Sequence, residues 1–165
     1  MHIRLEDTAD IDAIRQITEA AFEGAPYSAG TEGRIIDALR AADALTVSLV
    51  AEDGGEVIGH VAFSPVTIEG AGCGWYGLGP VAVRPDRHRG GIGQLLIRQG
   101  LSRLAILGAK GCVVLGDPGY YGRFGFSHDP GLRYEGAPPE YFTRLVIAGP
   151  APTGAVAFHD GFNVA

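Results

Sequence analysis

The spacing of apolar residues divides the first third of the chain into one strand and two helices. Alternating apolar and polar residues predict a short strand over residues 2–6. Apolar positions then recur every three or four residues, which predicts a helix that Thr8 or Asp10 caps. After a loop rich in small and polar residues, Thr31 is expected to cap a second amphipathic helix.

Three strand patterns occupy the middle of the chain. Residues 45–51 and 57–63 are rich in β-branched and apolar residues, and Asp53-Gly54-Gly55 between them is typical of a hairpin turn. A third strand is predicted over residues 75–83, after a glycine-rich turn at 70–74. These three strands are therefore expected to form an antiparallel meander.

A polar connection over residues 84–90 leads into the longest helical pattern, residues 91–107. Gly108 is a good residue to end this helix, because glycine readily adopts a positive φ. The apolar face expected to be buried consists of Leu95, Leu96, Leu101, Leu104 and Leu107.

The last third of the chain is predicted to add short elements. Residues 112–115 form an apolar run that is typical of a fully buried strand. One helical turn is expected over 120–123, and two strands over 141–148 and 155–158. A strand, a helix and another strand in succession imply a right-handed crossover, so we expect the strand over 112–115 to lie beside residues 81–83.

This order of elements indicates an α/β (α+β) protein. We expect a mixed, mostly antiparallel central sheet with helices on both faces. Neither an internal repeat nor a linker interrupts the pattern, so residues 1–165 are expected to form a single domain.

Composition and charge exclude several classes of function. The 13 basic and 19 acidic residues give a formal net charge of −6, and Lys110 is the single lysine. A protein that binds nucleic acid through its phosphates needs a basic face, so we expect no nucleic-acid partner. No apolar run approaches the ~20 residues of a membrane-spanning helix, so we expect no membrane association.

The two cysteines, Cys73 and Cys112, lie far apart and have no clustered histidine partner. This pattern predicts neither a disulfide framework nor a metal site. It is typical of a reducing compartment, so we expect a cytoplasmic protein.

Glycine supplies the first sign of a binding site, with 26 residues in the chain. Gly90, Gly91 and Gly93 lie between a predicted strand and the start of the long helix. Such a turn exposes backbone N–H groups at the positive end of the helix dipole, which is typical of a phosphate site. Arg87 and Arg89 add positive charge beside it. A plain structural turn is the alternative.

Two further segments flank this turn in sequence. Gly77-Leu78-Gly79-Pro80 lies in the preceding strand, where proline and glycine predict a bulge that leaves backbone groups unpaired. An extended ligand is able to pair with such groups as an added strand does. The aromatic segment 120–126 follows the buried strand, and it offers either packing or a phenol that donates a proton.

These motifs together identify a family. VAVRPDRHRGGIGQLL, residues 81–96, resembles motif A of the GNAT N-acetyltransferases, and YYGRFGF, residues 120–126, resembles the downstream Y-x-x-x-G-F element of that family. The segments LGPVAV and VLGDPGYYGRFGF are similar to the bacterial YhbS-type subgroup. His88 stands where the family usually has Gln or Arg. The resemblance covers most of the chain and implies the GNAT fold, with a splayed strand pair at the cofactor site.

The resemblance also implies roles for particular residues. Tyr121 matches the tyrosine that protonates the leaving thiolate of CoA. The strand segment Val81, Ala82 and Val83 would bind the pantetheine arm of acetyl-CoA, through backbone groups of Val81 and Val83. The diphosphate would be held by the N–H groups of Arg89, Gly90, Gly91, Ile92 and Gly93. Acetyl-CoA is thus the expected co-substrate, and a primary amine attacks its thioester directly.

Other features of the reaction stay open at this stage. The acceptor is a small-molecule or a protein amine, and a homodimer is left open because the family often dimerises. No residue is identified as the base: Glu32 has the pattern of a helix first-turn acid, His60 that of a strand histidine, and Asp117 that of a turn residue. Tyr120 is expected to pack. The alternative function is a CoA-binding regulatory module with little or no transfer activity.

Overall fold

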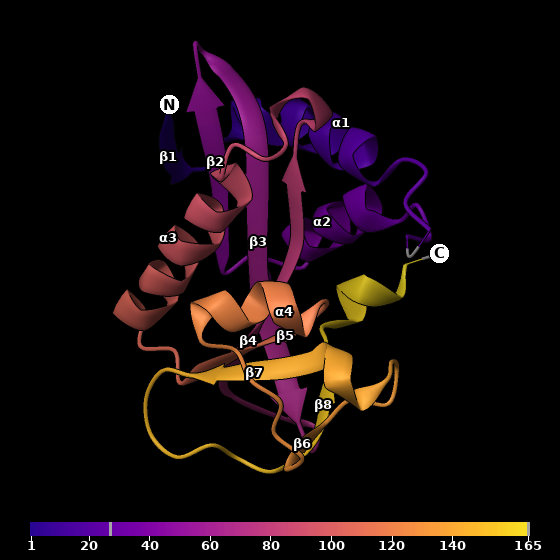
Figure 1. The fold of residues 1–165 in the computed structure, drawn as a ribbon, viewed down its shortest axis with the longest axis vertical. Helices are drawn as coiled ribbons and strands as arrows, with labels where there is room; N and C mark the ends of the chain where they lie inside the picture. Colours follow the sequence, from indigo (N-terminus) through magenta and orange to yellow (C-terminus); the bar gives the residue numbers. More distant parts are fainter. Residues whose placement is uncertain (27, 165) are drawn as a thin grey trace.

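The structure is a computed structural model that describes residues 1–26 and 28–164 (Figure 1). Its main sheet has the strand order β1-β2-β3-β4-β5-β7. Every neighbouring pair in this order is antiparallel except β4 with β5. The strands are β1 (His2–Leu5), β2 (Val47–Asp53), β3 (Glu56–Ile68), β4 (Ala71–Val83), β5 (Gly111–Leu115) and β7 (Phe142–Val146). The predicted mixed, mostly antiparallel sheet is confirmed.

Two short strands lie beside the lower part of this sheet. β6 (Leu132–Arg133) pairs in parallel with β8 (Gly154–Ala157), and β8 pairs with the end of β3. β8 lies close to the prediction of 155–158. The sequence did not predict β6, because two residues are too few to show an alternating pattern.

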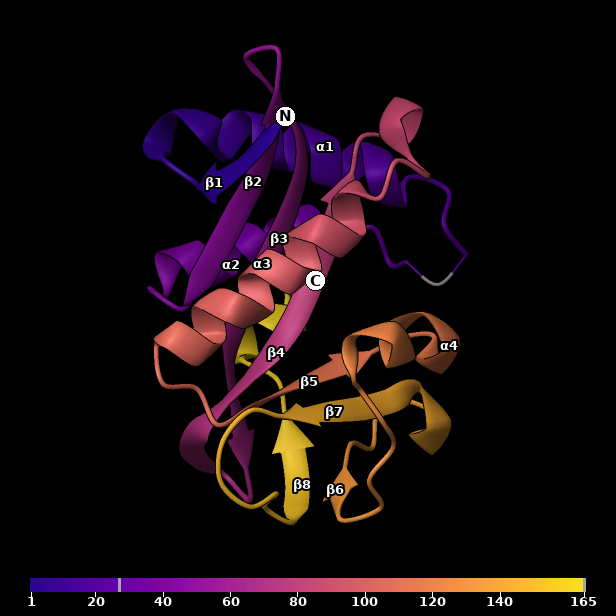
Figure 2. The same cartoon turned by 60° about the vertical axis from the view of Figure 1, so that its left-hand side comes forward.

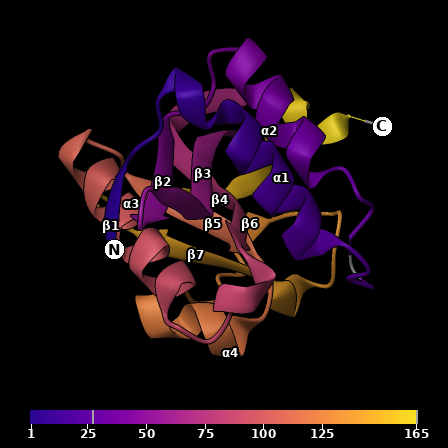
Figure 3. The same cartoon turned by 90° about the horizontal axis from the view of Figure 1, so that it is seen from above.

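Helices cover both faces of the sheet. α1 (Ile11–Phe22) and α2 (Glu32–Ala41) pack on one face, and α3 (Ile92–Ile106) packs on the other (Figure 3). A single helical turn, α4 (Pro118–Tyr121), follows β5 and continues into a 3-10 turn over Gly122–Phe124. The described residues include no helix long and apolar enough to cross a membrane.

Helix starts differ from the prediction. Asp7 caps a 3-10 turn before α1, and the backbone N–H of Ala9 donates to its carboxylate at 2.9 Å. Asp10 makes no cap for α1 because its carboxylate accepts from Arg4 at 2.7 Å and from the Asp7 N–H at 2.8 Å. Thr31 occupies the N-cap position of α2, but its side chain makes no capping hydrogen bond.

The buried face of α3 also differs from the prediction. Leu95 is 42% exposed and Leu107 is 62% exposed, while Leu96 and Leu104 are fully buried. The helix packs on β2 and β3 through one buried face, which consists of Ile92, Leu96, Ile97, Gly100 and Leu104. Leu101 is half-buried and packs at the side of this face. Leu95 and Leu107 lie outside it, so the prediction was wrong for these two.

Two apolar clusters stabilise the sheet around the place where β4 and β5 meet. One lies under α3 and contains Leu49, Val61 and Phe63. The other lies under β8 and contains Trp75 and Val113. The predicted buried strand holds for Cys112, Val113 and Val114, but Leu115 at its end is exposed. The two clusters hold the strand ends that shape the site.

Candidate functional site

β4 and β5 pair for three residues and then separate (Figure 2). Their parallel ladder joins Trp75–Gly77 to Gly111–Val113, and β4 continues unpaired on this side to Val83. The expectation that residues 112–115 lie beside 81–83 was wrong in register. The pairing occurs six residues earlier in β4, because the two strands diverge beyond Gly77. The open edge of β4 lies on the inside of the V that the two diverging strands form, and this space is called the cleft below.

A β-bulge lies at the point of divergence. Val81 pairs with Val61 on β3, and Leu78 pairs with Phe63, so two residues of β4 oppose Ala62 alone. These two residues are Gly79 and Pro80, which are joined by a cis peptide bond. Gly79 has a φ of +132°, a conformation that side-chain-bearing residues rarely adopt. The predicted bulge is confirmed.

The hydrogen-bond pattern beyond the bulge decides which backbone groups face the cleft. The N–H of Arg84 donates to the carbonyl of Ile58 at 2.8 Å. Alternation in an antiparallel ladder then turns the backbone groups of Ala82 toward β3, and those of Val81 and Val83 away from it. Val81 and Val83 therefore present the groups predicted to pair with an extended ligand. Ala82 offers no backbone hydrogen bond on the cleft side.

The side chain of His88 already makes a hydrogen bond to one of these backbone groups. Its Nε2 lies 2.8 Å from the carbonyl oxygen of Val83. A carbonyl oxygen only accepts, so the ring donates from Nε2. The N–H of Val83 and both backbone groups of Val81 remain on the open edge.

The predicted phosphate loop follows directly. Arg89 and Gly91 have φ values of +69° and +76°. This turn brings the chain to the first residue of α3, Ile92, whose N-terminus has no side-chain cap. The first-turn N–H groups are therefore available to an anion at the positive end of the helix.

The arginines around this loop differ in whether a carboxylate pairs with them. Arg87 pairs with Asp53, and this guanidinium holds the pKa of the Asp53 carboxyl below its usual value. Arg84 lowers the pKa of Asp86 in the same way. Within the part of the chain that the structure describes, Arg89 makes no ion pair. Arg89 is thus the loop arginine whose charge is not already matched by a carboxylate.

α4 carries two adjacent tyrosines, Tyr120 and Tyr121. The carboxylate of Asp117 accepts from the Gly119 N–H at 2.9 Å, which starts the helical turn directly after β5. The ring of Tyr121 lies against Gly116, where a methyl group on Gly116 would approach it to 2.6 Å. Tyr120 packs edge-on against Tyr121 with ring centroids 5.0 Å apart.

A cavity of about 620 Å³ adjoins the bulge on the face that α1 and α2 cover. Its walls come from the end of α1, the start of α2, the bulge, the end of β5, β6, β8 and the C-terminal turn. Aromatic side chains in its lining are Phe22, Tyr134, Phe158 and Phe162. The cavity thus meets the cleft at Leu78, Gly79 and Pro80.

Three carboxylates line this cavity, and the structure shows an ion pair for none of them. They belong to Glu32, Glu135 and Asp160. Glu32 accepts from the Ser28 hydroxyl at 2.6 Å. The arginine of the lining, Arg133, lies 3.5 Å from Glu69. The cavity therefore has a negative charge that its own arginine does not neutralise.

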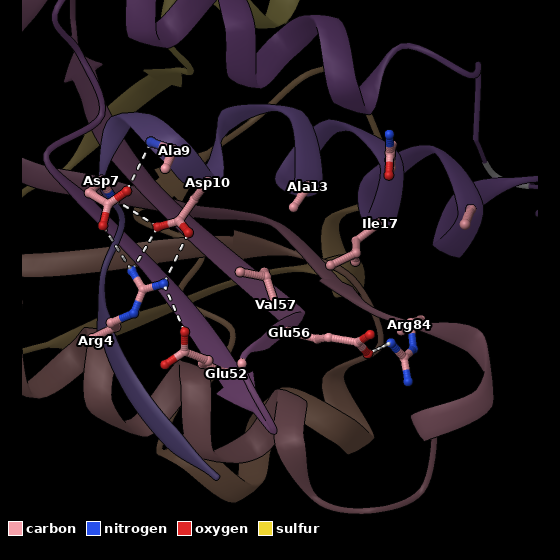
Figure 4. A pocket seen from close by; sticks show the side chains of 13 residues that line it. Arg4, Asp7, Ala9, Asp10, Ala13, Ile17, Glu52, Glu56, Val57 and Arg84 are labelled. Atoms are coloured by element: carbon pink, nitrogen blue, oxygen red, sulfur yellow. Dashed lines mark hydrogen bonds and ion pairs between the residues drawn. The ribbon is translucent and has the colours of Figure 1, made fainter.

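A second hollow of about 670 Å³ lies between α1 and the β2–β3 hairpin (Figure 4). None of the predicted site residues lines it. Its ionic groups are matched to one another: Arg4 lies 2.7 Å from Asp10 and 3.4 Å from Glu52, and Arg84 lies 3.0 Å from Glu56. Asp7 also pairs with Arg4, at 3.7 Å, so each ionic group that lines this hollow lies in an ion pair within the protein.

His60 lies in the middle of β3 and is completely buried. Its Nε2 is 2.7 Å from the Ser48 hydroxyl, which in turn donates to the carboxylate of Glu6. Ser48 therefore accepts from Nε2–H, and the ring is the neutral tautomer with Nδ1 bare. Nδ1 has no hydrogen-bond partner in the structure. Burial, with the charge of Arg40 adding to it, lowers the pKa of His60 to about 3.

The cysteines and the histidines form no metal centre in the described ranges 1–26 and 28–164. Cys73 and Cys112 are both unpaired, and burial raises the pKa of the Cys112 thiol. A buried thiol of this kind packs as a small apolar residue.

Comparison with known proteins places these features in a family. Residues 45–128 match the family model described as "Acetyltransferase (GNAT) domain". The chain is 36% identical over 171 residues to "Uncharacterized N-acetyltransferase YhbS" of Escherichia coli (strain K12), covering 99% of both chains.

Solved structures agree with this match. A GNAT family acetyltransferase from Brucella melitensis, in complex with acetyl-CoA, superposes with a TM-score of 0.88 at 55% identity, covering 98% of this chain and 97% of that one. YhbS from Escherichia coli, in complex with CoA, gives a TM-score of 0.91 at 34% identity, covering 99% and 92% of the two chains.

Proposed function

The chain belongs to the GNAT acetyltransferase family and is an acetyl-CoA-dependent N-acetyltransferase, and from this premise we propose where its cofactor and its acceptor bind. The cofactor lies in the cleft between β4 and β5, and a primary amine lies in the cavity beside the bulge. The observation that carries this assignment is the unpaired edge of β4, which leads directly into the N–H-rich start of α3.

The pantetheine arm extends along β4 as an added strand. It pairs with the N–H and carbonyl of Val81 and with the N–H of Val83, since His88 already bonds the Val83 carbonyl. The diphosphate sits on the N–H groups from Arg89 to Gly93, where the helix dipole and the unpaired charge of Arg89 stabilise it. In this proposal, residues 1–165 form a single domain that contains both the cofactor site and the acceptor site.

The amine attacks the thioester carbonyl directly, so no enzyme nucleophile is required. A C–N bond forms, the C–S bond breaks, and Tyr121 donates a proton to the departing sulfur. The proton that the new amide nitrogen then loses restores the Tyr121 phenol through solvent. The acceptor must lose one proton to become nucleophilic. Glu32 or a water molecule in the cavity is the group placed to take that proton.

The cavity favours a cationic acceptor. Its carboxylates Glu32, Glu135 and Asp160 attract an ammonium group, and its aromatic walls accept the apolar part of the acceptor. Both a small amine and an amine on another protein fit this description. The expected homodimer and the expected cytoplasmic location stay predictions.

The sequence had left open a CoA-binding regulatory module, which would retain the cofactor cleft and transfer little or no acetyl group; no observation in this structure favours it. The two functions share the binding site and differ in turnover. A thiol-release assay with acetyl-CoA and a panel of primary amines separates them, because thiol appears with an acceptor only if the protein is a transferase.

The controls for this assay distinguish binding from chemistry. Calorimetry with CoA measures the cofactor site without any acceptor. Binding of CoA with no amine accepted, and no effect of Tyr121→Phe on slow thioester hydrolysis, would support the regulatory module. Absence of CoA binding would contradict both functions.

A further inference from the structure

The hydroxyl of Tyr120 lies at the start of α3, close to the end of β4. A methyl group placed on Gly93 would lie 3.6 Å from the Tyr120 hydroxyl oxygen and 3.7 Å from a methyl of Val83. The phenol therefore reaches from α4 to the point where β4 ends and the first turn of α3 begins. This is the turn whose backbone N–H groups face the cleft.

The ring of Tyr120 is held in this position by its neighbours. The guanidinium of Arg123 lies 4.6 Å over the ring centroid, and its Nε donates to the Tyr120 carbonyl at 2.9 Å. The Phe124 ring packs edge-on at 5.6 Å. A ring fixed on two sides loses little freedom when its hydroxyl binds a ligand.

The hydroxyl itself is not used by the protein. Among the residues that the structure describes, it makes no hydrogen bond, although the side chain is half-buried. Burial raises the pKa of the phenol, so it stays protonated near neutral pH and is a donor. An unpaired donor beside the uncapped first turn of α3 is complementary to an anion, which accepts from the phenol and from the N–H groups together.

We infer that Tyr120 donates a hydrogen bond to the diphosphate of CoA beside the first turn of α3. The inference rests on the proposed binding of CoA in this cleft. Arg123, stacked on the ring, adds positive charge to the same side. Tyr120 is then a cofactor-binding residue, and it is separate from the proton donor proposed at Tyr121.

The geometry separates these two tyrosines. Tyr121 lies against Gly116, directly after β5, whereas Tyr120 reaches Gly93 in α3. One phenol is associated with the end of β5 and the other with the phosphate loop. A loss of the Tyr120 hydroxyl should therefore weaken binding of the phosphate end of the cofactor and leave the thiol end unaffected.

The test compares Tyr120→Phe with the wild-type protein by calorimetry, using three ligands. The probes are CoA, 3′-dephospho-CoA and pantetheine, which lacks the diphosphate. The variant keeps the ring and removes only the oxygen. We expect Kd to rise about tenfold for CoA and for 3′-dephospho-CoA, as for a lost hydrogen bond to a charged group. We expect no change for pantetheine, measured by its competition with CoA.

Two controls make the result specific. Tyr141→Phe removes a hydroxyl from an exposed tyrosine outside the cleft and should leave all three affinities unchanged. The melting temperature of Tyr120→Phe should equal that of the wild-type protein, because the hydroxyl has no protein partner to lose.

Other results would overturn the inference. An unchanged Kd for CoA in Tyr120→Phe would show that the hydroxyl does not contact the cofactor. Equal weakening for pantetheine would place the contact at the thiol end. A tenfold effect confined to CoA, with none for 3′-dephospho-CoA, would place it at the 3′-phosphate. Failure of the wild-type protein to bind CoA would instead contradict the proposed function.

Discussion

Acid should destabilise this protein through His60, well before its carboxylates are protonated. The residue is completely buried in β3, and burial lowers the pKa of its ring from 6.5 to about 3. Below pH 6.5 the unfolded chain binds a proton at this residue while the folded protein does not. Folding stability is therefore complete above pH 6.5 and is lost as the pH falls toward 3.

The size of the loss follows from the two pKa values. Each unit of difference corresponds to about 1.36 kcal/mol, so the loss between pH 7.5 and pH 5.0 is about 2 kcal/mol. The Glu6 carboxylate lies 3.9 Å from the ring. Arg4 lowers the pKa of Asp10, a buried carboxyl, so Asp10 titrates below its usual 3.8 and outside this range. The interval from pH 7.5 to 5.0 thus reports on His60 in preference to Asp10.

Urea unfolding at the two pH values measures the effect, with His60→Gln as the variant. The glutamine amide is able to donate to Ser48 as the ring does, but it does not titrate. We expect the wild-type protein to lose about 2 kcal/mol of unfolding free energy and His60→Gln to lose less than about 0.5 kcal/mol. His128→Gln, at an exposed histidine, should behave as the wild-type protein does.

The reasoning would be refuted if the wild-type protein were equally stable at both pH values. It would also be refuted if His60→Gln lost as much stability as the wild-type protein over the same range. In either case the ring would be protonated in the folded state, and the neutral tautomer assigned to it would be wrong.

Three further changes test the site and its support. Gly93→Val should raise Kd for CoA at least tenfold by crowding the phosphate loop. Calorimetry with an unchanged Kd would refute the loop assignment. Tyr121→Phe should lower kcat at least tenfold in the thiol-release assay, with little change in Kd for CoA. An unchanged kcat would exclude Tyr121 as the group that protonates the leaving thiolate. Gly100→Ala should lower the free energy of unfolding by about 1–3 kcal/mol in urea, because its methyl would meet the Phe63 ring at 2.1 Å. CoA affinity should be retained. A fully stable variant would contradict the packing described.

Features encoded by neighbouring residues were predicted well from the sequence. Gly79 and Pro80 predicted the bulge because both disfavour regular pairing, whatever strand lies opposite. The glycine turn before α3 predicted the loop with positive φ at Gly91 for a similar reason. These are local preferences of the backbone, and no distant segment is needed to produce them.

Predictions that depended on contacts with a distant segment of the chain were less accurate. Asp10 was expected to cap α1, but the structure commits its carboxylate to Arg4 on β1. Leu107 was expected in the core, but the direction in which α3 lies across β2 and β3 leaves it exposed. In each case the side chain could serve two purposes, and the packing of another element selected one.

The sequence by itself predicted the bulge and the glycine loop, which the structure confirms, and its motifs indicated the family. The cofactor-binding residues that it indicated stay a prediction. Only the tertiary structure decided that Tyr120 faces the loop while Tyr121 lies against Gly116. It also brought together a cavity from segments between Phe22 and Asn163. The reason is physical: backbone preferences act between neighbours along the chain, whereas a cavity and the direction of a side chain depend on contacts between segments that only folding brings together.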